Sequence, residues 1–347
     1  MRKVLQMVAT AAAGAAAIKL SRTLVRRHVA MRRVAPELRS PLVYVFPPIP
    51  SSRPPKRRPW LDGLMNRLVI RRGAEPQVFA GQGGHPDVTG YLYDAVGRRR
   101  PSGAVLWIHG GGMMLGLAAQ NHPTATRLAR DLGVVVATLD YRLAPEHPFP
   151  AALDDCMTVL RWLHRNAEEL GIDPARIAVG GESAGGGLAA VVAQRAHDEG
   201  IPVAFQVLIC PMLDERTVLR DAGTRGELIW TPANNVAAWE WYLGHPVRQF
   251  GSRPYTSAAR RHDLTGLPPA WIGVGDIDLF HDEDLDYARR LTEAGVPVQV
   301  LVVPGMAHGM DMLPAAPMQA FRDSWTRSLA AHIAREPAPG GSRGGVT

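Results

Sequence analysis

The stretch AVGGESAGGGLAAVVAQ, residues 178–194, places one serine between glycines where an apolar run meets a helical pattern. Gly181, Ser183 and Gly185 form the pattern Gly-x-Ser-x-Gly. In a sharp turn from a strand into a helix, a Cβ atom at either glycine would clash, and the serine Oγ is left exposed at the tip. The helix that begins there directs the positive end of its dipole at a developing oxyanion. This stretch therefore predicts a nucleophilic serine.

A glycine-rich phosphate-binding turn is the alternative interpretation of the same residues. The GGESAGGG sequence lacks the GK[ST] ending of a phosphate-binding loop. It also lies too late in the series of strands to be the first turn of a dinucleotide-binding fold. Both observations favour the nucleophile.

A second glycine motif, HGGG at residues 109–112, ends the apolar run GAVLWIHG. Glycines directly after a buried strand allow backbone N–H groups to turn toward a carbonyl oxygen. A plain glycine-rich loop is the simpler alternative. The Gly-x-Ser-x-Gly pattern follows 74 residues later, and this pairing favours an oxyanion-binding loop.

From about residue 75 onward, short apolar runs alternate with helical stretches. This alternation predicts an α/β fold in which a mostly parallel sheet has helices on both faces, here over residues 75–335. Residues 214–250 interrupt the alternation and are predicted to form a helical cap. The glycine-rich residues 336–347 are predicted to be a disordered tail.

The net charge of +7 is unevenly distributed along the chain. Residues 1–75 contain 16 Lys and Arg against 3 Asp and Glu, so the remaining residues carry a net charge of −6. A nucleic-acid-binding protein usually spreads basic residues over its folded surface, so no nucleic-acid partner is expected. Only two cysteines are present, Cys156 and Cys210, which argues against a zinc site or disulfide framework and favours the cytoplasm.

The basic N-terminal arm, residues 1–60, admits three interpretations. Its apolar run at residues 4–18 is short for a membrane span but resembles the core of a secretory signal. Residues 20–33 read as a basic amphipathic helix that lies on an anionic membrane or packs over the mouth of the domain. Peripheral membrane contact through residues 1–33 is therefore one hypothesis, beside packing and cleavage. A proline-rich linker follows at residues 47–59.

A general base is expected after the serine, because hydrolases with such a turn carry serine, acid and histidine in this order. His308 lies in VVPGMAHGM, on a glycine-bounded loop after a predicted strand at residues 298–303. The acid should follow the predicted strand at residues 269–275. Spacing alone does not separate Asp276 from Asp278. Asp282 and Glu283 read instead as first-turn residues of the next helix.

These motifs, in this order, resemble those of the hormone-sensitive lipase-like family of α/β-hydrolases, of the bacterial carboxylesterase type. The resemblance extends over most of residues 90–330. It rests on HGGG (109–112), YRLAPEHPFPAALDD (141–155), GESAGG (181–186), GLPP (266–269), DLFHDEDLDYARRL (278–291) and PGMAHG (304–309). One departure is Glu182, where family members more often carry Asp or Thr. Within YRLAPE, Arg142 and Glu146 are expected to pair.

The resemblance implies an α/β-hydrolase fold and assigns roles to individual residues. Ser183 is the nucleophile, His308 the base and Asp278 the acid, because the family acid opens a D-x-L-x-D-E run; Asp276 is the fallback. The N-terminal segment and the insertion would form the cap. The oxyanion hole would use the amides of Gly111, Gly112 and Ala184, with Gly110 sharing this role. Trp230, Trp239 and Trp241 become candidate walls of the substrate pocket, or they simply pack the cap.

The expected function is that of a serine carboxylesterase acting on short- to medium-chain acyl esters, with a small-molecule ester as partner and no metal or organic cofactor. A homodimer is a further expectation. Two alternatives stay open: a non-catalytic small-molecule-binding protein on the same fold, and an amidase, lactonase or acyltransferase that uses the same three residues.

Overall fold

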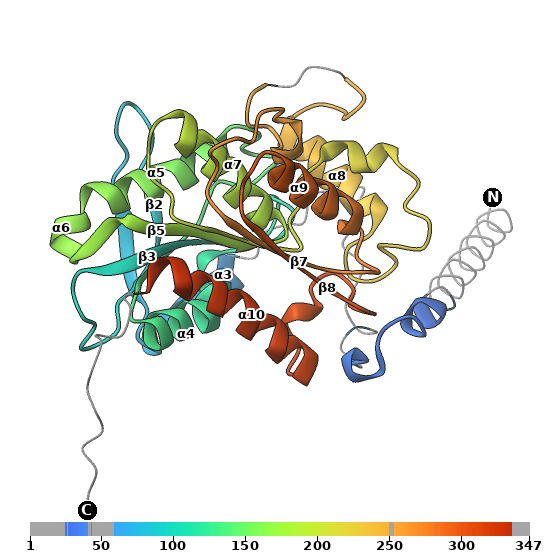
Figure 1. Cartoon of the computed structure of the whole chain (residues 1–347), viewed down its shortest axis with the longest axis horizontal. Helices are drawn as coiled ribbons and strands as arrows, with labels where there is room; N and C mark the ends of the chain where they lie inside the picture. The colour runs from blue at the N-terminus through green and yellow to red at the C-terminus, as the bar shows by residue number, and fades with distance from the viewer. Residues whose placement is uncertain (1–24, 26, 41–42, 44–58, 250–252, 335–347) are drawn as a thin grey trace, which may run out of the picture.

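The computed structural model describes residues 25, 27–40, 43, 59–249 and 253–334 (Figure 1). An eight-stranded sheet in the order β1-β2-β4-β3-β5-β6-β7-β8 forms its centre. The strands are β1 (Glu75–Phe79), β2 (Val88–Tyr93), β3 (Ser102–Ile108), β4 (Val135–Leu139), β5 (Ile172–Glu182), β6 (Gln206–Ile209), β7 (Ala270–Gly275) and β8 (Val298–Val303).

Six of these strands, β3 to β8, pair in parallel, while β1 and β2 join one edge in antiparallel fashion. The predicted mostly parallel sheet is thereby confirmed. The strands β3, β4, β6 and β7 are buried along their whole length, as expected for strands covered on both faces.

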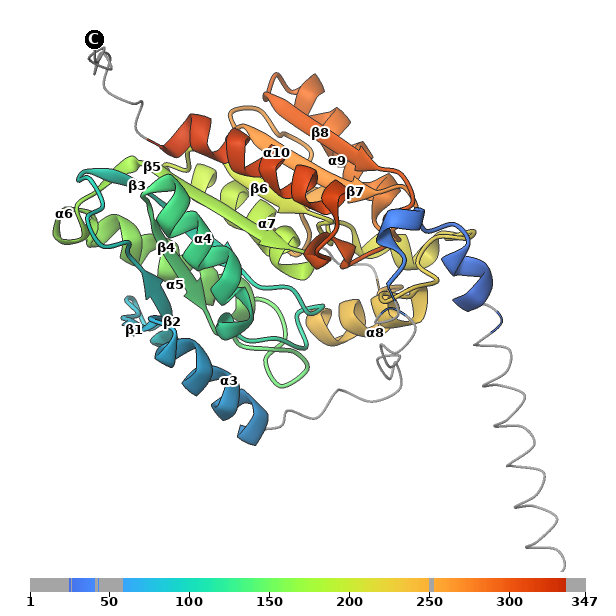
Figure 2. The same ribbon diagram turned by 90° about the horizontal axis from the view of Figure 1, so that it is seen from below.

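Helices cover both faces of the sheet. On one face lie α4 and α10; on the other lie α5, α7 and α9 (Figures 1 and 2). The α-helices are α3 (Pro59–Arg71), α4 (His122–Leu132), α5 (Ala151–Arg165), α6 (Ala167–Leu170), α7 (Ala184–Asp198), α8 (Pro232–Leu243), α9 (His281–Glu293) and α10 (Ala316–Ile333). Short 3₁₀ helices are η1 (Pro36–Leu38), η2 (Ala118–Asn121), η3 (Glu215–Leu219), η4 (Ala258–Arg260) and η5 (Met310–Met312).

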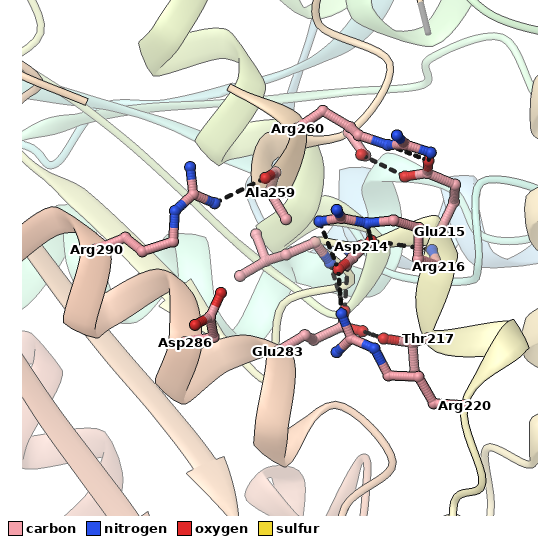
Figure 3. A network of polar contacts seen from close by, with 12 residues as sticks. Asp214, Glu215, Arg216, Thr217, Arg220, Ala259, Arg260, Glu283, Asp286 and Arg290 are labelled. Carbon is pink, nitrogen blue, oxygen red and sulfur yellow. Dashed lines mark hydrogen bonds and ion pairs between the residues drawn. The ribbon is translucent and has the colours of Figure 1, made fainter. Parts of the chain in front are cut away.

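The segment between β6 and β7 contains η3, α8 and η4, where the sequence predicts an insertion. A polar network joins this segment to α9 (Figure 3). In it, Glu283 accepts hydrogen bonds from the backbone N–H groups of Leu213 (2.7 Å) and Asp214 (3.2 Å) and from the Thr217 hydroxyl. The insertion is therefore fixed to the start of the helix that follows β7.

Several N-terminal and C-terminal predictions lie outside the described residues: the apolar run 4–18, nearly all of the linker 47–59, and the tail 336–347. Of the predicted helix at residues 20–33, residues 27–31 are described and helical. Within the described ranges, the helices are too short or too polar to cross a bilayer.

Candidate active site

Ser183 occupies the sharp turn between β5 and α7. Its backbone has φ 55° and ψ −121°, a conformation that a non-glycine residue rarely adopts. A Cβ atom on Gly181 would lie 2.5 Å from the Ile108 carbonyl oxygen, and one on Gly185 would lie 2.1 Å from the same atom. Both glycines are therefore needed for β3 and the start of α7 to approach so closely.

The structure brings Ser183, Asp278 and His308 together from three separate strand ends. The Nε2 atom of His308 lies 2.8 Å from the Ser183 Oγ, and its Nδ1 atom lies 2.9 Å from the Asp278 Oδ2. Asp278 is fully buried and His308 is 6% exposed. Parallel strands present their carboxyl ends at one edge of the sheet, and for this reason residues 30 to 125 positions apart meet here.

The same geometry separates the two aspartates that spacing leaves equal. The Asp276 Oδ1 accepts a hydrogen bond from the Gly305 N–H (2.7 Å), so this side chain fixes the loop that carries His308. The Asp278 carboxylate contacts the imidazole itself, and its Oδ1 accepts from the Phe280 N–H (3.0 Å). Asp282 and Glu283 lie in the first turn of α9, where the sequence predicts them.

Electrostatics around His308 favour its protonated form. Burial by itself would lower the pKa of His308, but the negative charge of Asp278, the hydrogen bond to it and the charge of Asp311 outweigh this effect and raise the pKa. The Phe280 ring lies edge-on to the imidazole, with ring centroids 5.1 Å apart. The imidazole is thus held between a carboxylate and an aromatic ring, in an orientation suited to accept the Ser183 proton.

The HGGG loop lies directly beside the serine. A Cβ atom on Gly110 would lie 2.9 Å from the Glu182 carbonyl oxygen and 3.3 Å from the Ser183 Cβ. Gly111 and Gly112 have positive φ angles, 122° and 62°. Within the described ranges, no acceptor contacts the N–H groups of these two glycines. Their amides, and that of Ala184 at the start of α7, remain available to an oxyanion.

Tyr141 supports this loop from the core side. Its ring stacks on the His109 imidazole with centroids 4.1 Å apart, and its hydroxyl donates to the His109 carbonyl oxygen (3.0 Å). The next residue corrects one expectation: Arg142 pairs with Asp155 (2.8 Å) rather than with Glu146, whose side chain is exposed. Asp155 is 2% exposed and lies on α5, within reach of the Arg142 backbone N–H as well.

The three tryptophans of the insertion occupy different environments. The indole of Trp230 lies over Gly112, where a Cβ atom would come within 2.4 Å of it, and 6.2 Å from the His308 ring centroid. Trp239 is fully buried against Tyr242, and Trp241 is half-buried at the edge of the same core. Among the described residues, Trp230 is the one tryptophan of the three whose ring supplies the atoms nearest to such a Cβ atom on the glycine loop.

Sequence reasoning singled out Glu182 without a role and missed its neighbour Asp311. Both side chains line a cavity of about 580 Å³ between α4, η5 and α10. Burial and the charge of Asp311 raise the pKa of Glu182 to about 8, against the effect of a hydrogen bond from the Trp107 indole N–H (3.2 Å). Burial also raises the pKa of Asp311. No local pattern joins two acids 129 positions apart, so the sequence offered no signal for this pair.

Ligand atoms of Cys210, Asp278 and His308 lie within 4.8 Å of one another, the spacing of a metal site. Two of them, the Asp278 carboxylate and the His308 Nδ1, already share a hydrogen bond. Burial raises the pKa of the Cys210 thiol well above its ordinary value, which disfavours the thiolate that a metal requires. Both cysteines are buried and unpaired.

Comparison with known proteins identifies relatives of this chain. A family described as the alpha/beta hydrolase fold matches residues 105–312. Carboxylesterase NlhH of Mycobacterium tuberculosis is 41% identical over 208 residues, which are 59% of this chain and 65% of NlhH. Esterase LipI of the same organism is 37% identical over 207 residues, 59% of this chain and 64% of LipI. The chain thus matches slightly less than two thirds of the length of these curated relatives.

Among solved structures, one described as a bacterial heroin esterase is similar over nearly its whole length. The TM-score is 0.80 and the sequence identity 35%, and the match covers 88% of this chain and 99% of that one. The structural similarity therefore extends beyond the matched family region of residues 105–312.

Proposed function

The chain belongs to the hormone-sensitive lipase-like family of α/β-hydrolases, and from this premise we propose that it is a serine carboxylesterase. One observation carries the proposal: the hydrogen-bonded series from Asp278 through His308 to Ser183. Relatives named as carboxylesterases and esterases support the choice of an ester bond.

In the proposed mechanism, His308 Nε2 accepts the proton of the Ser183 hydroxyl while Oγ attacks the ester carbonyl carbon. The Nδ1–H of His308 stays directed at Asp278, which stabilises the imidazolium. The N–H groups of Gly111, Gly112 and Ala184 hold the oxyanion of the tetrahedral intermediate, and Gly110 shares this role. The imidazolium then gives its proton to the departing alcohol, and a water molecule hydrolyses the acyl-enzyme by the same route.

The proposed substrates are short- to medium-chain acyl esters. Trp230 contacts the glycine loop, and its indole would restrict the space beside the carbonyl carbon. Trp239 and Trp241 would act through the packing of the insertion. An amidase, a lactonase or an acyltransferase would use the same intermediate, and substrate profiling separates these from an esterase.

The remaining assignments are proposals of the same kind. Residues 75–335 would form the catalytic domain with residues 214–250 as cap insertion, residues 1–60 would complete the cap, and 336–347 would be a tail. The protein would work without metal or organic cofactor, in the cytoplasm, as a homodimer, and without nucleic acid. Contact of residues 1–33 with a membrane surface would be peripheral.

Hydrolysis of p-nitrophenyl esters with two to sixteen acyl carbons tests the function. We expect a maximum at short to middle chain lengths and a loss of about 10⁴-fold or more in kcat for Ser183→Ala, because no other group replaces the nucleophile. Circular dichroism shows whether the variant is folded. A folded wild type without turnover would refute the esterase and favour the non-catalytic binding protein. Substantial activity in Ser183→Ala would refute the assigned nucleophile.

A further inference from the structure

Helix α3 exposes a row of large apolar side chains. Trp60 is 67% exposed, Leu64 56% and Leu68 40%, and their spacing of four residues places them along one side of the helix. Ile70, at 44%, is also exposed but lies apart from this row, about 120° around the helix from Leu64. Single exposed apolar residues are common on protein surfaces, but three in a row along one helix mark an interaction surface.

The opposite side of α3 is packed against the protein. Val69 is 3% exposed, and Met65 packs with it in the core that also contains Ala118 and Ala119 of η2. The helix is therefore held in place by its inner side. Figure 2 shows α3 at the periphery of the molecule, beside the β1–β2 edge of the sheet. The exposed row is thus the free side of a docked helix.

Basic side chains accompany the exposed row. Arg67 and Arg71 are exposed on the same side, and Arg72 directly follows the helix. In the described parts of the chain, these three arginines form no ion pair with a carboxylate. Asp62 is the one acid of α3, and helical spacing places it near Val69 on the inner side. The free side is therefore both apolar and cationic.

We propose that α3 docks the protein onto the surface of an anionic lipid bilayer. Leucines and a tryptophan on one side of a helix bury in the boundary between headgroups and acyl chains, while arginines contact anionic headgroups. The three residues that precede the helix, Lys56, Arg57 and Arg58, add further basic sequence. Residues 76–347 carry a net negative charge, so attraction to such a bilayer would orient the molecule with this side toward it.

A second copy of the chain fits this surface less well. A two-fold dimer through the free side of α3 would place Arg67 and Arg71 of both copies in one interface, where like charges repel. No acid lies on this side of the helix to compensate them. The surface begins at Trp60, so this proposal is distinct in sequence from the hypothesis of membrane contact through residues 1–33.

Docking would place the bilayer near the candidate active site. Helix α3 packs on η2, and η2 follows the HGGG loop within six residues. An ester that leaves the bilayer would then enter from the side of the molecule that carries this loop. This consequence rests on the proposed function, whereas the docking itself does not.

Co-sedimentation of the full chain with vesicles tests the docking. Vesicles of phosphatidylcholine alone are compared with vesicles that contain 30% phosphatidylglycerol, for wild type and two double variants. We expect wild type to prefer the anionic vesicles, with binding that weakens as salt rises. Trp60→Ser with Leu64→Ser should lower the partition coefficient by more than about tenfold. Arg67→Gln with Arg71→Gln should lower it by about fivefold for each arginine.

Matched controls are Val96→Ser and Arg130→Gln, which alter exposed residues on other parts of the surface and should bind as wild type does. Wild-type binding by both double variants would overturn the proposal and assign any membrane contact to residues 1–33. Equal binding to neutral vesicles would overturn the anionic preference. Absence of vesicle binding, with a dimer in sedimentation velocity that Trp60→Ser and Leu64→Ser dissociate, would assign the surface to a second copy. Hydrolysis of a soluble ester reports separately on the proposed function.

Discussion

Two groups of acidic side chains lie at the same edge of the sheet and differ in their partners. After β7, Asp276 accepts a backbone hydrogen bond and Asp278 contacts an imidazole. On the other side of the serine, Glu182 and Asp311 line one cavity, and burial together with the charge of Asp311 raises the pKa of Glu182. The difference teaches that burial by itself does not fix the role of a carboxyl group, because a neighbouring imidazole, backbone N–H group or second carboxyl group also contributes.

Asp284 extends this lesson within the first group. It is fully buried in α9, only six residues after Asp278, yet neither of its carboxyl oxygens has a hydrogen-bond partner among the described residues. Burial and the charges of Glu283 and Asp278 raise its pKa well above the ordinary value. Proximity in sequence therefore does not give two aspartates the same chemistry.

The largest effect is expected when the carboxylate that contacts the His308 imidazole is replaced by an amide. Asp278→Asn should lower kcat/KM for a short p-nitrophenyl ester by about 10⁴-fold, because an amide neither selects the Nδ1–H tautomer of His308 nor stabilises the imidazolium. Asp276→Asn, which changes the residue two positions earlier, should lower kcat/KM by less than about tenfold. Steady-state kinetics of both variants measure the difference. Equal losses would show that the acid role is shared, and a larger loss for Asp276→Asn would reverse the assignment.

The second test concerns the proton that Glu182 retains. Because its pKa is raised to about 8, the folded state binds this proton more tightly than the unfolded chain does. The stabilising effect is present in full below the ordinary glutamate pKa and is lost as the pH rises toward 8. Glu182→Gln removes this dependence, so between pH 5 and pH 8 the variant should gain roughly 2–4 kcal/mol in unfolding free energy relative to wild type.

Urea unfolding at several pH values measures this relative gain. The matched control is Glu146→Gln, which changes an exposed acid outside the cavity and should not reproduce the gain of Glu182→Gln. A constant difference for Glu182→Gln would mean that this carboxyl group ionises normally in the folded state, and the contrast between the two acidic groups would then fail.

The smallest expected effect concerns Asp311, which belongs to the second acidic group but influences the imidazole that Asp278 contacts. The charge of Asp311 is one of the influences that raise the pKa of His308. Asp311→Asn should therefore shift the acidic limb of the kcat/KM profile to lower pH, since His308 becomes neutral at lower pH, with less than about a tenfold change at the plateau. Asp286→Asn, exposed on α9, should leave the limb in place. A limb that moves to higher pH would contradict the assigned electrostatics.

Local chemistry explains how much of this arrangement could be predicted from the sequence. The turn at Ser183 and the loop at Gly111 depend on glycines at fixed offsets, and a sheet of alternating strands and helices presents such turns at one edge. Spacing could not separate Asp276 from Asp278, because both follow the same strand and only side-chain direction distinguishes them; the family resemblance favoured Asp278, in agreement with the contact to His308.

Contacts between distant segments were outside the reach of local patterns. The expected pairing of Arg142 with Glu146 is wrong, because Asp155 reaches the guanidinium from α5 and Glu146 faces solvent. The pair of Glu182 and Asp311 depends on how η5 lies against the end of β5. The exposed side of α3 could likewise not be predicted from the sequence, because it depends on the packing of the other side of this helix on η2.

The order of the strands has a consequence for how the protein acquires its chemistry. Ser183 ends a strand in the middle of the sheet, whereas His308 follows β8 at the edge, 125 residues later. Contacts between such distant residues form slowly, and domains fold from the N-terminal side during synthesis. A nascent chain that has completed β5 already displays the serine but has no base to activate it. The nucleophile therefore stays inert until the last strand pairs, and in refolding the recovery of turnover should lag behind the recovery of helical structure.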